Sequence, residues 1–479
     1  MTSCFSAGAS YVSANSTSAE TGAGQDNALA ISKRRSLGPI KMELPTNKAP
    51  LEPRKPVLPG LLHRLREHPL LRVGPGLVTG VADDDPSGIA TYSQAGAQFG
   101  LNMLWTMPFA YPLMSAVQSM CARIGRVTGK GLAANIKGTF PPIVLRIVVA
   151  LLLVANVLNI AADVAAMGEV AELVSGINRH AMTAVFVIAT LLLQVFIPYD
   201  RYVLFLKWLT LSLLAYAAVL FTVHVPWKEV AARTFWPRFT IDASAAAVIV
   251  AVFGTTISPY LFFWQASQEV EDMNATPGAL PLIDDKATAP AELRRIRWDT
   301  WSGMLYSNVA AYFIILATAV TLHVAGVTSI ETAAQAASAL RPLAGNFAFF
   351  IFALGILGVG MIGVPVLAGS GAYALSETMG WSEGLELKAV DARGFYGVIA
   401  VSVLAGLAIQ YSPISPMRAL FWSAVINGVV AVPLIVVIIL LARNKQVMGA
   451  FAASRSLILM GWITAIVMGA AAIRMFIPG

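Results

Sequence analysis

Residues 74–100 read GPGLVTGVADDDPSGIATYSQAGAQFG. The segment is long enough to cross a bilayer as a helix, but three aspartates, Asp83 to Asp85, and Pro86 lie in its middle. A charged side chain at the bilayer centre costs about 2.5–3.5 kcal/mol on insertion scales, and proline removes a helical hydrogen bond and clashes with the preceding turn. We therefore expect this helix to unwind near its middle, where it is buried in protein or lines a cavity.

A second segment has the same kind of interruption. Residues 248–272 read VIVAVFGTTISPYLFFWQASQEVED, with Ser258 and Pro259 in the middle of an apolar run. We expect unwinding over residues 84–88 in the first segment and over residues 255–259 in the second, with the two breaks side by side. In transporters built this way, paired discontinuous helices form the substrate site near the membrane midplane.

The composition of the whole chain predicts an all-α integral membrane protein. Of its 479 residues 57% are hydrophobic and 12% are charged, and the mean hydropathy is +0.69, whereas a soluble domain carries about 25% charged residues. The apolar runs are long and do not alternate in polarity, which argues against a β-barrel. We predict eleven spans near residues 75–98, 103–122, 143–174, 181–198, 202–224, 245–271, 300–325, 346–377, 394–411, 417–442 and 456–476.

Basic residues give the expected orientation. They cluster after the even-numbered spans, so these ends should face the cytoplasm; the residues are Arg123, Arg126, Lys130, Lys137, Lys286, Arg294, Arg295, Arg297, Lys388, Arg393, Arg443 and Lys445. The net charge of +7 then reflects membrane topology and does not indicate nucleic-acid binding. We predict a multi-pass protein of the cell membrane with a cytoplasmic N-terminus and an external C-terminus.

The two breaks are five spans apart, and the two sets of five spans run in opposite directions. This pattern is typical of a 5+5 inverted repeat. We expect the repeats over about residues 75–224 and 245–442 and an extra helix over residues 456–476, all within a transmembrane domain of residues 71–479. Residues 1–70 are rich in Ser, Ala, Pro and charge, which predicts a disordered cytoplasmic tail.

The first break resembles the signature of a known family. Asp85-Pro86-Ser87-Gly88-Ile89-Ala90-Thr91, followed by Gln94-Ala95-Gly96-Ala97, resembles the Asp-Pro-Gly-Asn, Ile-Ala-Thr and Gln-Ala-Gly-Ala pattern of the natural resistance-associated macrophage protein (NRAMP) family of divalent-metal transporters. The resemblance covers about residues 72–442 and implies the leucine-transporter-like fold. It also implies alternating-access transport of a divalent cation.

The family's functional residues fall on particular positions of this chain. Its first-span Asp falls on Asp85, and its metal-binding Asn falls on Gly88. Ser258-Pro259-Tyr260 stands where the family has Met-Pro-His, and Thr255 stands where the family supplies a backbone carbonyl. In span three Asp163 matches the family's Asp, and Ala166 stands where the family has a Glu used in proton movement. The chain therefore resembles a divergent branch of the family.

These positions define the expected site. Asp85 should coordinate the cation, with the Thr255 carbonyl, Ser258 and the space at Gly88 beside it, and with Asp84 as a neighbouring ligand or proton carrier. A thioether favours softer metals, whereas hydroxyl and carbonyl oxygens favour Mg²⁺ or Mn²⁺. The alternatives are a salt bridge or a helix cap for the aspartates and simple close packing for Gly88 and Ser258.

Two further acidic positions bear on the transport path. Asp163 is the remaining candidate for proton movement, its alternative being a hydrogen bond to a neighbouring helix, and we expect proton coupling to be weak or absent. Glu269, Glu271 and Asp272 end the second interrupted span, where such a run is usually a solvated helix end and could otherwise line an exit path.

Other functions remain as alternatives at this stage. The same architecture could carry a small organic or anionic solute on the N-termini of its half-helices, or it could serve as a membrane sensor that signals through its tail. The sequence contains no HExxH motif and no recognisable pair of nucleophile and base, so we do not expect an enzyme. We expect no cofactor, and the expected partners are the transported ion and the lipid bilayer.

Overall fold

The computed structural model of the chain describes residues 75–197, 211–238, 242–409 and 415–477. The predicted disordered tail at 1–70 and the first part of the fifth predicted span, residues 202–210, lie outside these ranges. Within the described residues the regular structure is entirely helical, which agrees with the predicted all-α class.

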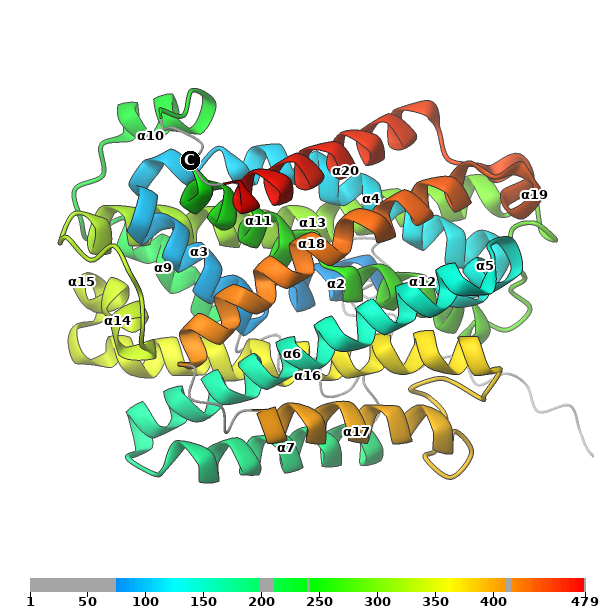
Figure 1. Cartoon of the computed structure of the whole chain (residues 1–479), viewed down its shortest axis with the longest axis horizontal. Coiled ribbons are helices and arrows are strands. Elements are labelled where there is room, and N and C mark those ends of the chain that lie inside the picture. Colours follow the sequence, from blue (N-terminus) through cyan, green and yellow to red (C-terminus); the bar gives the residue numbers. More distant parts are fainter. Residues whose placement is uncertain (1–74, 198–210, 239–241, 410–414, 478–479) are drawn as a thin grey trace, which may run out of the picture. The chain divides into compact units, whose positions relative to one another are not determined.

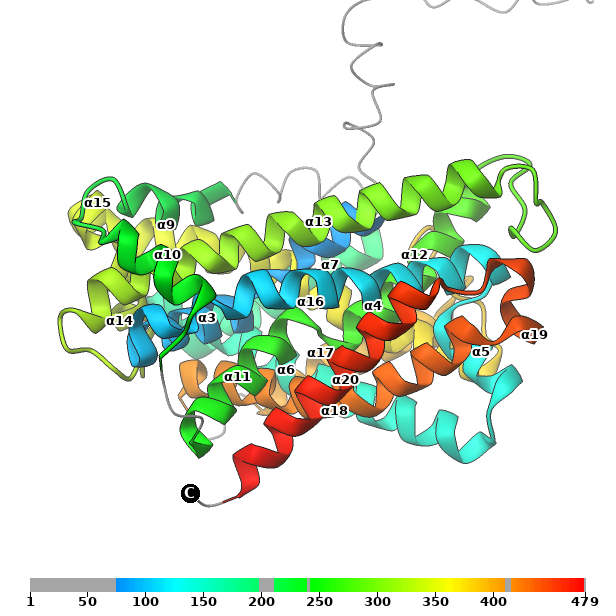
Figure 2. The ribbon, with the colours of Figure 1, turned by 90° about the horizontal axis from the view of Figure 1, so that it is seen from above.

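Figures 1 and 2 show the helices of residues 75–477 from two perpendicular directions. Their bounds are α2 Pro75–Asp83, α3 Pro86–Phe99, α4 Thr106–Thr128, α5 Leu132–Thr139, α6 Pro142–Ser175, α7 Arg179–Phe196, α9 Leu214–Val219, α10 Trp227–Phe235, α11 Ala243–Thr256, α12 Pro259–Ala275, α13 Ala289–Thr318, α14 Ala333–Ala337, α15 Arg341–Ala344, α16 Ala348–Met379, α17 Arg393–Ile409, α18 Pro416–Arg443, α19 Lys445–Met448 and α20 Arg455–Phe476.

Seven helical stretches in the described ranges are long and apolar enough to cross a membrane. One of them, Ala243–Ala275, consists of α11 and α12 together. The first predicted span corresponds to α2 and α3, and the third to the long helix α6. The count of eleven spans and the inverted repeat stay predictions.

Both predicted helix breaks are present, and both are shorter than expected. α2 ends at Asp83 and α3 begins at Pro86, while α11 ends at Thr256 and α12 begins at Pro259. Each proline occupies the first helical position, where its missing N–H costs nothing and its fixed φ suits the helix. The predicted extents, 84–88 and 255–259, were therefore wrong by a few residues, because each proline starts the next helix at once.

The two breaks lie side by side. Figure 1 has α3 and α11 towards one side of the bundle and α2 and α12 towards the other. The Ser87 and Thr255 hydroxyl oxygens are 3.5 Å apart, and the Tyr92 hydroxyl lies 3.0 Å from the Thr256 hydroxyl. The chain thus brings its two interrupted helices together near the centre of the described bundle.

The half-helix α2 lies directly on α13. A Cβ atom added to Gly80 would come within 2.2 Å of the Gly303 carbonyl oxygen, so only glycine permits this approach. The Gly76 N–H donates to the Asp299 carboxylate at 2.6 Å, which fixes the start of α2 on the same helix. Small residues at such contacts let membrane helices pack closely, and here they hold one half of the first broken helix.

Candidate functional site

Asp85 lies at the first break and makes contacts with three other elements. Its Oδ1 accepts the Gly88 N–H at 2.8 Å, which caps α3. Its Oδ2 accepts hydrogen bonds from Asn159 Nδ2 of α6 at 3.1 Å and from the Tyr260 hydroxyl of α12 at 3.2 Å. Asp85 is only 1% exposed. The capping role considered for this residue is therefore present, and its carboxylate also joins both breaks to α6.

Helix α6 presents a second carboxyl group to this region. Asp163 lies one turn beyond Asn159, on the same face of the helix, and both side chains are fully buried. The carboxyl group of Asp163 is within electrostatic range of Asp85. Neither of its oxygens has a hydrogen-bond partner of normal geometry among the described residues. A buried carboxyl group is costly unless it is paired, and Asp163 faces the backbone N–H of Ser87.

Asp83 and Asp84 are directed elsewhere. Both carboxylates contact the hydroxyl of Ser307 on α13, Asp84 at 3.0 Å and Asp83 at a shorter distance. The contacts of Asp85 are with α3, α6 and α12. Because the chain is helical up to Asp83 and extended at Asp85, Asp83 and Asp84 share Ser307 as a neighbour while Asp85 faces other elements.

The expected ligands of the second break lie close to the first. The Ser258 hydroxyl is within hydrogen-bonding distance of the Gly254 carbonyl at 2.8 Å and the Thr255 carbonyl at 2.7 Å. A Cβ atom added to Gly88 would lie 3.3 Å from the Thr255 hydroxyl. A hydroxyl has one hydrogen and two lone pairs, so the oxygen of Ser258 can still accept or coordinate while it donates to its own helix.

No group of three or more His, Cys, Asp or Glu side chains within the described residues is arranged to hold a metal ion. A cation bound at the breaks would therefore need neutral oxygens in addition to carboxylates. Backbone carbonyls, hydroxyls, side-chain amides and retained water are the usual ligands of Mg²⁺ and of other hard cations. This part of the chain is rich in such groups.

A group of ion pairs joins α4, α12 and α13. We call it the arginine network, and it consists of Arg126, Glu269, Glu292 and Arg295. Arg295 pairs with Glu269 at 2.6 Å and with Glu292 at 3.2 Å, and Arg126 pairs with Glu292 at 3.1 Å. The side chain of Glu269 is 0% exposed. The expectation of a solvated helix end was wrong for Glu269, because an arginine from the next helix covers it and supplies its counter-charge.

A second acidic group lies beyond the arginine network, around the end of α16. The Tyr373 hydroxyl donates to Glu271 at 2.6 Å, and the Ser267 hydroxyl donates to Glu377 at 3.0 Å. Burial, together with repulsion from Glu377 and Glu271, raises the pKa of Glu383 in the following loop to about 9. Its carboxyl group is therefore protonated at neutral pH.

Towards the other end of α3, polar side chains hold the loop that follows α13. We call this group the Gln94 clamp, and it consists of Gln94, Glu331 and Arg418. Gln94 donates to the Thr328 carbonyl at 3.1 Å and accepts from the Ile330 N–H at 2.8 Å. Arg418 of α18 pairs with Glu331 at 2.6 Å. A cavity of about 240 Å³ lies here, lined by Ala90, Gln94, Gln98, Ser329, Ile330, Met417, Arg418, Phe421 and Trp422.

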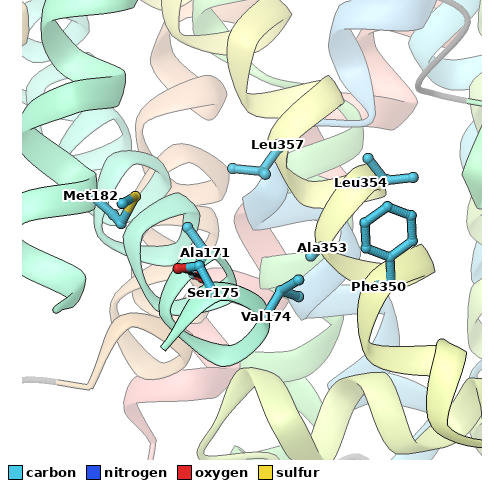
Figure 3. A pocket seen from close by; sticks show the side chains of 8 residues that line it. All are labelled: Ala171, Val174, Ser175, Met182, Phe350, Ala353, Leu354 and Leu357. Carbon is cyan, nitrogen blue, oxygen red and sulfur yellow. Dashed lines mark hydrogen bonds between the residues drawn. The ribbon is translucent and has the colours of Figure 1, made fainter. Parts of the chain in front are cut away.

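Figure 3 shows a different cavity, of about 180 Å³, between α6, α7 and α16. Its lining consists of Ala171, Val174, Ser175, Met182, Phe350, Ala353, Leu354 and Leu357. The one hydroxyl group in this lining, that of Ser175, already donates to the Ala171 carbonyl at 2.6 Å. The cavity therefore offers no free polar ligand and is not a candidate cation site.

Sequence reasoning missed Asn159, and it saw Tyr260 only as the residue that replaces a histidine. A signal for Asn159 was available: it recurs with Asn156 and Asp163 at intervals of three and four residues in an otherwise apolar span, which places the three polar groups on one helical face. The contact of Ser307 with Asp83 and Asp84 joins residues more than 220 positions apart, and no local pattern indicates it.

Comparison with known proteins identifies the family. Residues 76–478 match the family described as natural resistance-associated macrophage protein-like. The chain belongs to this family. It is similar to the divalent metal cation transporter MntH of Acidiphilium cryptum, with 25% identity over 396 residues that cover 80% of this chain and 85% of that protein. The MntH of Verminephrobacter eiseniae is 28% identical over 374 residues, covering 73% and 80% of the two chains.

Solved structures show the same fold. The Eremococcus coleocola manganese transporter, in complex with an aromatic bis-isothiourea substituted compound, has a TM-score of 0.67 at 17% identity, covering 86% of this chain and 87% of its own. The resemblance proposed from Asp85-Pro86 and its surroundings is therefore confirmed at the level of the family and the fold.

Proposed function

We propose that this member of the natural resistance-associated macrophage protein-like family is a secondary transporter that moves a divalent metal cation across a membrane by alternating access. The observation that carries the proposal is Asp85, a buried carboxylate at the meeting point of two helix breaks. The relatives named as divalent metal cation transporters and as a manganese transporter support the same class of substrate.

The proposed site combines Asp85 with neutral oxygens of the second break. Asp85 supplies negative charge, the Thr255 carbonyl and the Ser258 hydroxyl supply oxygen ligands, and Gly88 adds no side chain to a gap in which a Cβ atom would already lie 3.3 Å from the Thr255 hydroxyl. We propose that the bound cation keeps some of its water. Asp84 adds a second negative charge nearby. Oxygen ligands without a thioether favour Mg²⁺ or Mn²⁺ over softer metals, and we propose one of these two ions as the substrate.

The cap on α3 argues for a cation over an anionic solute. A helix N-terminus attracts anions through its free N–H groups, but here the carboxylate of Asp85 already accepts the Gly88 N–H. An approaching anion would meet that negative charge. The alternative of an organic or anionic solute therefore receives no support from this end of α3.

We place the protein in the cell membrane with the start of α2 and the arginine network on the cytoplasmic side and the C-terminus outside. The reason is the distribution of basic residues along the chain. With this orientation, residues 75–224 and 245–442 form the inverted repeats, and residues 456–476 add a further helix. The Gln94 clamp then faces the exterior.

The central test is uptake by the purified full-length chain in proteoliposomes over Mg²⁺, Mn²⁺, Ca²⁺ and Zn²⁺. Asp85→Asn keeps the shape and a capping oxygen but removes the charge, so uptake should fall by about tenfold or more. Asp242→Asn, at the exposed cap of α11, is the matched control and should transport normally. Normal transport by Asp85→Asn, or no divalent-cation uptake by the wild type, would contradict the proposal.

We further infer that transport is coupled to protons weakly or not at all. Tyr260 and Ala166 stand where the family resemblance places a His and a Glu, and Asp163 remains as the candidate for proton movement. Internal pH should then stay constant during metal uptake. Metal-dependent acidification that disappears in Asp163→Asn would show that this inference is wrong.

A further inference from the structure

Helix α6 carries the most informative polar groups outside the two breaks. Asn159 is fully buried, donates through Nδ2 to Asp85 at 3.1 Å, and leaves its Oδ1 without a hydrogen-bond partner among the described residues. Buried side-chain oxygens are normally paired. The amide oxygen of Asn159, which has no partner and lies next to a buried carboxylate, is therefore an unusual feature of this region.

The amide group of Asn159 can turn by 180° about its last bond. Its N–H end, which faces Asp85, and its oxygen end have nearly the same shape. After the turn, Oδ1 would lie beside Oδ2 of Asp85. Two such oxygens repel each other unless a cation lies between them, and with a cation between them they form a pair of ligands.

We propose that Asn159 is a ligand of the transported cation, and that the cation lies between Asp85 and α6, with Asp163 as the second carboxylate. The N–H of Asn159 occupies the position on Asp85 Oδ2 that the cation takes, and the cation displaces it by turning the amide. This inference rests on the proposed function and adds to its site two residues of α6.

The charges are consistent with this placement. Asp85 and Asp163 together carry the two negative charges that balance a divalent cation. Asp163 has no cationic partner among the described ion pairs, and its oxygens make no hydrogen bond of normal geometry, only a looser contact with the Ser87 backbone N–H. A Cβ atom added to Gly363 of α16 would lie only 3.1 Å from the Asp85 Cβ, so α16 packs closely against the base of this side chain.

The chemistry also suits a hard cation. Amide and carboxylate oxygens are preferred ligands of Mg²⁺ and Mn²⁺. The family resemblance places its metal-binding Asn on Gly88 of α3, where this chain has no side chain. In the proposed site an amide oxygen reaches the cation from α6 instead.

The test compares two substitutions of Asn159 in the full-length protein. Asn159→Asp keeps an oxygen ligand and loses the N–H donor, whereas Asn159→Leu loses both. If Asn159 is a ligand, Asn159→Leu should raise the Mn²⁺ and Mg²⁺ dissociation constants about tenfold or more, while Asn159→Asp should bind at least as tightly as the wild type. If Asn159 serves only as a donor that positions Asp85, the two variants should be impaired alike.

Asn156→Leu is the matched control. Asn156 is a buried Asn on the same helix, and its Nδ2 donates to the Leu367 carbonyl and the Ser370 hydroxyl of α16, both at 2.8 Å. Its removal should lower thermal stability without changing the cation affinity of the folded protein. Binding is measured by calorimetry on monodisperse protein, and the rise in unfolding temperature with added Mn²⁺ provides an independent readout.

The outcomes separate the two proposals. Wild-type uptake that is lost in Asp85→Asn but unchanged in Asn159→Leu would overturn the role of Asn159 and leave the transport function intact. Equal impairment of Asn159→Asp and Asn159→Leu would also overturn it. Failure of the wild type to bind or carry any divalent cation would instead contradict the transport function itself.

Discussion

Replacing Arg295 by Gln should destabilise the contact between α12 and α13 that the Arg295–Glu269 pair makes. Arg295 lies 2.6 Å from Glu269, whose side chain is 0% exposed, while 29% of the Arg295 side chain is exposed. Water cannot reach Glu269 where it lies. Removal of the arginine therefore leaves a buried carboxylate without a counter-charge, and such a group is costly.

The magnitude follows from the burial of each partner. Breaking a buried ion pair by removing one partner costs about 3–5 kcal/mol. Arg295 is partly exposed, and Gln265 Nε2 remains 3.3 Å from the other oxygen of Glu269, so we expect a value near the lower end. A loss of about 3 kcal/mol corresponds to a factor of roughly one hundred in the ratio of molecules that keep this contact to molecules that have lost it.

Two measurements on the purified protein check this. The first is the thermal unfolding temperature of Arg295→Gln. The second is the reactivity of a cysteine placed at Thr79, a fully buried residue of α2, towards a membrane-impermeant thiol reagent, in a background where both cysteines of the chain, Cys4 and Cys121, are replaced by Ser. Arg295→Gln should lower the unfolding temperature and make the Thr79→Cys site reactive from the side that carries the arginine network.

Arg233→Gln is the matched control. Arg233 pairs with Glu229 at 3.3 Å, but 52% of the Glu229 side chain is exposed. Exposed pairs of this kind contribute about 0.3–0.5 kcal/mol, so the control should behave like the wild type. The double variant Glu269→Gln, Arg295→Gln removes the uncompensated charge and should recover part of the stability. Unchanged stability and reactivity in Arg295→Gln would refute the reasoning.

Two further predictions concern selectivity and pH. Ser258→Met should raise the ratio of Zn²⁺ to Mg²⁺ uptake, because a thioether prefers softer metals; Ser258→Ala controls for the lost hydroxyl, and an unchanged ratio would count against Ser258 as a ligand. Glu383 has a pKa of about 9 in the folded protein against an ordinary value of 4.5. As the pH rises from 4.5 to about 9, the unfolded chain loses this proton while the folded chain keeps it, so the free energy of unfolding falls over this range. Glu383→Gln should therefore unfold at a higher temperature than the wild type at pH 8 and at the same temperature at pH 4, and equal unfolding temperatures at pH 8 would be evidence against the raised pKa.

The sequence predicted the positions of the breaks well because their causes are local. Pro86 and Pro259 forbid a continuous helix whatever surrounds them. Their extent was less predictable, since it depends on where each new helix begins. Asp85 caps α3 at once, and this keeps Gly88 helical where unwinding was expected.

The site was only partly predictable because its contacts join distant parts of the chain. Asp85 stood out as a carboxylate within a span, but nothing near it in sequence indicates Asn159, 74 residues away. Glu269 had the local appearance of a solvated helix end. Its burial depends on Arg295 of the next helix, and a sequence pattern along one helix cannot reveal a partner that only the packing supplies.

The contacts of Asp85 suggest how a bound cation would act on both ends of the transport path. Its Oδ1 holds the start of α3, the helix that carries Gln94 of the clamp, and its Oδ2 contacts Tyr260 of α12, the helix that carries Glu269. A cation that takes the Asn159 position on Oδ2 draws electron density from that oxygen, which weakens its hydrogen bond from the Tyr260 hydroxyl and leaves the cap at Oδ1 in place. We therefore infer that cation binding loosens α12 before it loosens α3. In the proposed orientation the arginine network would then open first, which releases the cation to the cytoplasm while the Gln94 clamp is still closed.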